Sequence, residues 1–276
     1  MFIFEIVLLV VSVIVLFISC YTDVRTREIP DFASWGLVGS ALLIRLVASF
    51  FDGWGILISG LIGFGCAAVL GLLMYYTHQW GGGDAKLLFG FGAVIGVSYP
   101  FTFSSLLLGL FALALFFGGA VWGLGWMLFE AMRCSGFLKK FWIRVREHKK
   151  VVVVSVVSAV LLSVVCAVFG FLVLIPLTLF VPFMLGLFFF VKTVEKECFI
   201  KDVSPLVLTP GDWLVDKVQV GSVVIDKRTL DDEDVEQIKK WFKSGLIKTV
   251  RVKYGIPFAP SFVVAYAAVL YVVYVR

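Results

Sequence analysis

Eight apolar segments constrain this chain more than any other feature of its sequence. A helix that spans a membrane needs about 20 mostly apolar residues. Segments of this kind fall at roughly 2–22, 33–50, 55–76, 84–98, 103–130, 151–169, 171–191 and 258–275. They predict an all-α membrane protein, a polytopic helical bundle of about eight spans, with six spans plus a hairpin as the alternative.

Composition supports lipid as the main solvent and locates one polar exception. The 276 residues are 61% apolar, above the roughly 45–50% of soluble domains. Yet 12 of the 24 Lys and Arg and 11 of the 19 Asp and Glu lie between Lys192 and Tyr254. A small polar domain therefore interrupts the membrane body.

This pattern predicts five parts of the chain. They are a transmembrane core at 1–131, a basic cytoplasmic loop at 132–150, a transmembrane hairpin at 151–191 that turns near Gly170, a cytoplasmic α+β domain at 192–256, and a last transmembrane helix at 257–276. In the α+β domain, alternation from Trp213 to Ile225 predicts a β-hairpin at Gly221-Ser222. A helix of about four turns is expected from the acidic run after Thr229 to Gly245, and then a strand at 247–254.

Positive charge sets the expected orientation. Arg25 and Arg27 follow the first span, and seven Lys and Arg lie between Met132 and Lys150. The connections near Asp52, Tyr99 and Gly170 carry none. The two stretches that carry these Lys and Arg residues are therefore expected in the cytoplasm. The uncharged connections and the N-terminus are expected outside. Because loop bias accounts for the formal charge of +5, no nucleic-acid partner is expected.

Two aspartates stand where a membrane protein would not place charge without a use. Asp23 ends the first span, and Asp84 opens the fourth directly after Gly81-Gly82-Gly83. Odd-numbered spans end and even-numbered spans begin at the cytoplasm, so both carboxyls are expected at one membrane depth. Taken singly, each could be a helix cap.

Two neighbouring carboxyls can share one proton and activate water, with one accepting a proton from water and the other donating to a carbonyl. Glycines such as Gly81 and Gly83 permit close approach of a substrate backbone. The five cysteines, which have no ligand-like spacing, predict neither a metal site nor a disulfide framework. No cofactor is expected.

At these residues the chain resembles a known family, the intramembrane aspartic proteases with a G-x-G-D motif, and within them the type IV prepilin and archaeal preflagellin peptidases. The resemblance rests on two motifs in the expected order. The first is Asp23-Val24-Arg25 with Ile29-Pro30-Asp31, and the second is Gly81-Gly82-Gly83-Asp84-Ala85-Lys86-Leu87. A third motif, Gly255-Ile256-Pro257-Phe258-Ala259-Pro260, is only weakly similar. The first ten-residue connection lacks the paired C-x-x-C motifs of bifunctional bacterial members, so the chain is similar to the archaeal, peptidase-only type.

The resemblance implies an aspartic endopeptidase that cleaves class III signal peptides from pilin or archaellin precursors at the cytoplasmic face of the cell membrane. It implies Asp23 and Asp84 as the catalytic pair, water as the nucleophile, and membrane lipid and precursor proteins as partners. The hairpin at 151–191 departs from the family's six-span plan. A homo-oligomer is left open.

Further charged residues near the aspartates are open to more than one interpretation. Arg25 and Arg27 either report orientation, or hold the substrate or tune Asp23. Lys86 either snorkels to the headgroups or tunes Asp84. Asp31 caps the second span or, with Glu28, attracts the basic leader of the substrate. The acidic run at 231–234 is an alternative site for that attraction.

Two rival functions remain open from sequence. A presenilin-like intramembrane protease would also use two aspartates, but on adjacent later spans. A non-enzymatic transporter or assembly protein would bind protons or cations with them, usually deep within its spans and often with internal repeats. The sequence shows no repeat, and both aspartates lie at span ends.

Overall fold

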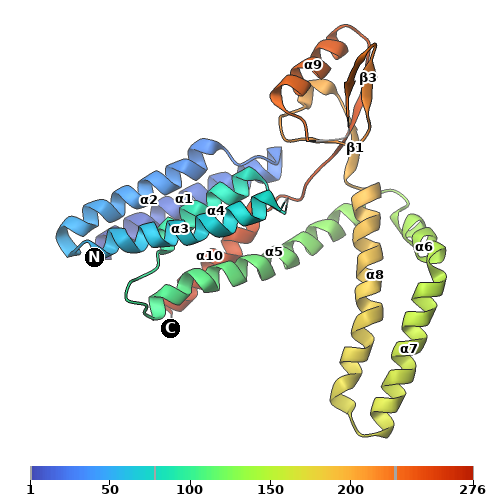
Figure 1. Ribbon diagram of the computed structural model, residues 1–276, viewed down its shortest axis with the longest axis horizontal. Coiled ribbons are helices and arrows are strands. Elements are labelled where there is room, and N and C mark those ends of the chain that lie inside the picture. The colour runs from blue at the N-terminus through green and yellow to red at the C-terminus, as the bar shows by residue number, and fades with distance from the viewer. Residues whose placement is uncertain (1, 78, 227–228, 276) are drawn as a thin grey trace. The chain divides into compact units, whose positions relative to one another are not determined.

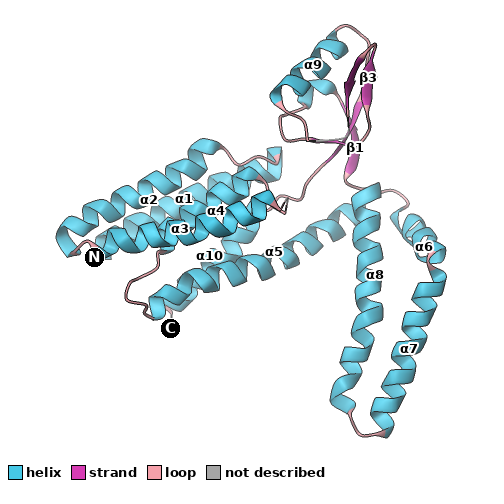
Figure 2. Cartoon of the chain, in the orientation of Figure 1, coloured by secondary structure: helices cyan, strands magenta, loops and turns pink. Residues whose placement is uncertain are grey.

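The computed structural model describes residues 2–77, 79–226 and 229–275. Met1, His78, Lys227, Arg228 and Arg276 lie outside the described residues. Helices dominate, and the strands are confined to one short region near the C-terminus (Figure 2). The chain divides into two compact units, 1–125 with 256–276 and 126–255, and the boundary falls within one long helix.

The first unit is a helical bundle (Figure 1). Helix α4 packs against α2 and α3, and α1 contacts α2, α4 and α10. The aromatic centre of the core is formed by Phe91, Phe111 and Phe262, all 0% exposed, with the Phe91 and Phe111 rings stacked at 5.2 Å. The helices are α1 (Phe2–Thr26), α2 (Asp31–Asp52), α3 (Gly55–Tyr76), α4 (Gly82–Ile95), α5 (Leu106–Arg133) and α10 (Ala259–Tyr274).

Six helices of the described chain are long and apolar enough to cross a membrane. They include α1, α2, α3 and α5, together with two helices of the second unit. The fourth and eighth predicted spans correspond to α4, of 14 residues, and α10, of 16 residues. Both are shorter than the roughly 20 residues of a full crossing. The eight-span topology and its orientation therefore stay predictions.

Glycines let α3 and α4 approach each other closely, as the glycine-rich fourth segment suggests. A Cβ atom on Gly92 would overlap the Ala67 side chain and the Gly63 backbone, and one on Gly63 would overlap Gly92. A Cβ on Gly71 would lie 2.7 Å from the Phe89 ring. These glycines therefore allow the short helix α4 to pack closely against α3.

Arg45 fixes the other end of α4. Its guanidinium donates to the Val94 carbonyl at 2.7 Å, the Ile56 carbonyl at 3.0 Å and the Ser59 hydroxyl at 2.8 Å. Val94 lies in the last turn of α4, whose carbonyls lack partners within the helix. Arg45, a residue of α2, therefore stabilises the C-terminal end of α4, the helix whose first turn contains Asp84.

The second unit holds a pair of long helices. Helices α7 (Lys149–Val168) and α8 (Ile175–Glu197) contact each other and are joined around Gly170, whose φ of +75° suits glycine. The turn predicted there is confirmed. The preceding segment, 132–150, was expected to be a loop but contains the amphipathic helix α6 (Phe137–Glu147). Its aromatic residues pack on one side, with the Phe137 and Phe141 rings stacked at 6.2 Å.

The small domain at the end of the second unit has an antiparallel sheet in the order β1-β5-β2 and a separate hairpin, β3-β4. Its core includes Leu214, Ile238 and Val252, which are at most 1% exposed. The elements are β1 (Ile200–Val203), β2 (Trp213–Leu214), β3 (Val218–Val220), β4 (Val223–Ile225), α9 (Asp232–Lys243) and β5 (Val250–Lys253).

The predicted elements of this domain are confirmed in part. The hairpin turns at Gly221-Ser222 as expected, because β3 pairs with β4. However, the predicted hairpin was too long: β2 pairs instead with β5. Helix α9 is about three turns long rather than four, and β1 was not foreseen, since Ile200–Val203 shows no clear alternation.

Candidate active site

Asp23 lies in the last turn of α1 and is 6% exposed. Its Oδ2 accepts a hydrogen bond of 2.7 Å from the backbone N–H of Ala259, the first residue of α10. The first N–H groups of a helix have no partner inside the helix, and they favour negative charge. The N-terminus of α10 therefore holds the Asp23 carboxyl in a fixed orientation.

The turn before α10 is itself anchored to the bundle. The indole N–H of Trp122 donates to the Pro257 carbonyl at 2.7 Å. The Phe258 ring lies 5.2 Å from the Trp80 ring, centroid to centroid. Proline-rich residues 255–260, which carried only a weak resemblance in the sequence, thus lie beside Asp23 and next to the segment that leads to Asp84.

Asp84 is partly buried in the first turn of α4, where no side-chain cap hydrogen bond is formed. The preceding glycines are closely surrounded. A Cβ on Gly83 would lie 3.0 Å from the Ile29 Cβ, and one on Gly81 would lie 3.3 Å from Asp84 Oδ2. Any larger residue at 81 or 83 would therefore crowd the carboxyl or the loop after α1.

The structure brings the two predicted motifs together. Helices α1 and α4 are in contact, and the carboxyls of Asp23 and Asp84 interact electrostatically. Lys86 Nζ lies 2.6 Å from Asp31 Oδ1, an ion pair that joins the start of α4 to the start of α2. Two acids 61 residues apart in the sequence thus share one region of the first unit.

The other residues predicted to support the site are Arg25, Glu28 and Asp31. Arg25 is exposed and its guanidinium lies 4.9 Å from the centre of the Tyr21 ring. Glu28 is exposed in the loop that follows α1. Asp31 is N1 of α2 and makes no side-chain cap there, because it pairs with Lys86.

Arg27, for which tuning of Asp23 was one of the interpretations open from the sequence, lies directly after α1. Its side chain interacts electrostatically with Asp23. Its backbone has φ of 63°, in the left-handed region that few residues other than glycine adopt. This backbone turn ends α1, where Arg27 N–H donates to the Asp23 carbonyl at 3.0 Å. A positive φ at an arginine cannot be read from a sequence pattern.

Cysteines and metal-ligating side chains are the other candidates for chemistry in the chain. All five cysteines are free. Burial, with Cys134 nearby, raises the pKa of the Cys198 thiol to about 12, whereas nucleophilic attack requires the thiolate. No group of three or more His, Cys, Asp or Glu side chains in the described parts of the chain is placed to hold a metal ion.

Comparisons with known proteins agree with the motifs. A family model described as the type IV leader peptidase family matches residues 10–130, which contain Asp23, Asp84 and the helices that carry them. The chain is also similar to a preflagellin peptidase from Methanococcus voltae, with 34% identity over 115 residues, or 38% of this chain and 48% of that protein. The match thus spans about half the length of that relative. No solved structure matches the chain significantly.

Proposed function

We propose, from the family match over residues 10–130, that this chain is a membrane aspartic endopeptidase that removes class III signal peptides from preflagellin or prepilin precursors. The observation that carries the proposal is the convergence of Asp23, Asp84 and the N-terminus of α10. The name of the Methanococcus voltae relative, preflagellin peptidase, supports preflagellin as the substrate class.

In the proposed mechanism the two carboxyls share one proton, because neighbouring carboxylates cannot both ionise readily. The ionised acid accepts a proton from water while the protonated acid donates to the carbonyl oxygen of the scissile bond. Water adds to the carbonyl carbon as these protons move. The C–N bond of the tetrahedral intermediate then breaks, and the acid that took the proton from water delivers it to the leaving amine. The Ala259 N–H orients Asp23 for this chemistry.

The expected topology fits such a substrate. Positive charge after α1 and around α6 favours a cytoplasmic site, with the N-terminus outside. A pilin-like precursor is itself a membrane helix with a short basic leader. It would approach laterally, with its scissile bond at the depth where α1 ends and α4 begins.

Of the acidic groups considered for binding the leader, Glu28 is the best placed. It is exposed and lies five residues after Asp23. Asp31 is already paired with Lys86. In the acidic run of α9, Asp231 and Asp234 form a reciprocal capping box, in which Asp231 Oδ1 accepts from the Asp234 N–H at 2.8 Å. We therefore assign the attraction of the leader to Glu28.

The deciding experiment compares Asp23→Asn and Asp84→Asn in detergent with a purified pilin-like precursor. Loss of a general acid or base should reduce processing by at least about 100-fold. Asp52→Asn is the matched control, because Asp52 is an exposed aspartate at the far end of α2. N-terminal sequencing of the product gives the cleavage position.

Cleavage at full rate by either Asn variant would refute the aspartic mechanism. Cleavage within the hydrophobic helix of the precursor, rather than before it, would favour the presenilin-like alternative. A wild-type chain that never cleaves but moves protons or cations in an Asp-dependent manner would favour the transporter.

A further inference from the structure

A cavity of about 640 Å³ lies in the second unit, at the polar end of the α7–α8 hairpin. Its walls come from the end of α6, the first turn of α7, the last turns of α8, and strands β1 and β5. None of its residues belongs to the group around Asp23 and Asp84, and the proposed peptidase activity makes no use of it.

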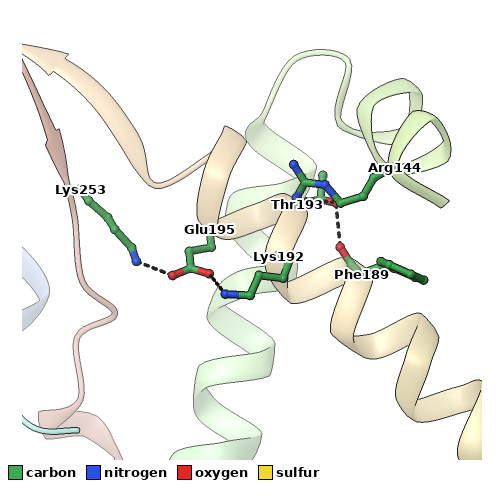
Figure 3. A network of polar contacts seen from close by, with 6 residues as sticks. All are labelled: Arg144, Phe189, Lys192, Thr193, Glu195 and Lys253. Atoms are coloured by element: carbon green, nitrogen blue, oxygen red, sulfur yellow. Dashed lines mark hydrogen bonds and ion pairs between the residues drawn. The ribbon is translucent and has the colours of Figure 1, made fainter. Parts of the chain in front are cut away.

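The polar wall carries a surplus of positive charge, and Figure 3 shows two of its lysines, Lys192 and Lys253, on either side of Glu195. Lys192, Lys196 and Lys253 line the cavity with Glu195. Glu195 pairs with Lys253 and, at 3.0 Å, with Lys192. Three ammonium groups thus face one carboxylate, and Lys196 has no carboxylate within 4.0 Å among the described residues. Lys192 and Lys196 are four residues apart and so share one face of α8.

A fourth cation, Arg144, also lines the cavity. Arg144 of α6 lies with its side chain only 18% exposed, 3.9 Å from Glu197. It donates to the Thr193 hydroxyl at 3.4 Å, and that hydroxyl donates to the Phe189 carbonyl at 2.7 Å. This chain of contacts (Figure 3) fixes α6 against α8 and places a guanidinium at the rim. Even with Arg144 assigned to Glu197, the lysines leave the cavity positive.

Part of the cavity lining is apolar and partly open. Val151 and Phe188 form it and are 55% and 54% exposed, and Leu185 continues it one turn further along α8. Both α7 and α8 are apolar enough to cross a membrane. The cavity therefore straddles the boundary between span-length apolar helices and a charged polar end, which is the depth of lipid headgroups.

We propose that this cavity binds the headgroup of an anionic phospholipid. The phosphate would accept from Lys192, Lys196 and Lys253, since ammonium groups bind phosphate as point charges. The acyl chains would lie along Leu185, Phe188 and Val151. A basic precursor leader is excluded because its charge has the same sign. A free phosphate would leave the apolar wall without a partner.

The test measures lipid retained by the purified full-length protein in native mass spectrometry. Phosphatidylglycerol is compared with phosphatidylcholine of the same acyl chains. The pocket variant is Lys192→Gln/Lys196→Gln, and the matched control is Lys139→Gln/Lys150→Gln, which removes the same charge from exposed positions outside the cavity. Phosphatidylglycerol should bind the pocket variant about 10- to 30-fold more weakly than the wild type and the control.

Further arms separate the headgroup from a simple charge effect. Phe188→Ser should weaken phosphatidylglycerol and leave binding of inorganic phosphate unchanged, while inorganic phosphate at equal concentration should fail to displace the lipid. Three results would each overturn the proposal. They are an equal loss of phosphatidylglycerol binding in the pocket and control Lys variants, binding of phosphatidylcholine as tight as that of phosphatidylglycerol, and displacement of the lipid by inorganic phosphate. Unchanged thermal unfolding midpoints establish that the variants are folded.

Discussion

At the scale of single residues, one ion pair connects the two sequence motifs. Lys86 and Asp31 lie 2.6 Å apart, with side chains 31% and 69% exposed. Partly exposed pairs contribute little to stability because water screens them. The position of the pair is more informative than its strength, since it joins the start of α4, where Asp84 lies, to the first residue of α2.

The first prediction concerns this pair. Lys86→Gln and Asp31→Asn should each lower processing no more than about fivefold, with a coupling of about 0.2–1 kcal/mol in a double-mutant cycle. The charge-swapped double variant Lys86→Asp/Asp31→Lys should recover most of the loss. If both Lys86→Gln and the charge-swapped double variant are inactive, direct tuning of Asp84 by Lys86 is favoured instead.

The second prediction concerns Glu28. If its exposed carboxylate attracts the basic leader, Glu28→Lys should raise the KM of precursor cleavage several-fold and leave kcat nearly unchanged, because rim charges act on encounter. Glu233→Lys, a change of the same sign at an exposed residue in the first turn of α9, should leave both constants alone. Steady-state kinetics at low and moderate salt would separate the two sites.

At the scale of secondary structure, helix α4 depends on glycine. Gly92→Ala would push a methyl group into Ala67 and the Gly63 backbone. Overpacking of this kind costs about 1–3 kcal/mol. Gly65→Ala on α3 has open space around the added carbon and should be neutral or stabilising by up to about 1 kcal/mol. Unfolding of both variants in the same detergent is the measurement, and equal destabilisation would contradict this account of the packing.

Helix positions were largely predictable, because apolar length and loop charge follow from the lipid solvent. The strand pairing of the α+β domain was less predictable from sequence, because the two-residue strand β2 pairs with β5, which is distant in the sequence. For the candidate site, sequence order predicted that Asp23 and Asp84 approach. It did not indicate the Ala259 N–H on Asp23, the turn at Arg27, or the Arg45 contact with Val94, since each depends on tertiary geometry.

At the scale of the whole molecule, the described chain has a large core around Phe91 in the first unit and a separate core around Ile238 in the second. The first unit is built from both ends of the chain, and the second from the residues between them. The small domain is therefore an insertion with a core of its own. Its stability should be separable from that of the bundle.

Ile238→Ala tests this separation. Ile238 is 0% exposed, and truncation of such a side chain costs about 2–5 kcal/mol. Hydrogen exchange followed by mass spectrometry should show faster exchange over residues 200–254 and unchanged protection over α4. Leu88→Ala, which is 1% exposed before truncation, should show the reverse pattern. Loss of protection in both regions from either change would mean that the cores unfold together.

The hydrogen bond between Asp23 and Ala259 also has a consequence for biosynthesis. Ribosomes make α1 first and the start of α10 some 236 residues later. A nascent chain already inserted in the membrane therefore carries Asp23 without its backbone donor until translation is almost finished. Premature termination before Ala259 would yield a product with both aspartates present and the first of them unanchored.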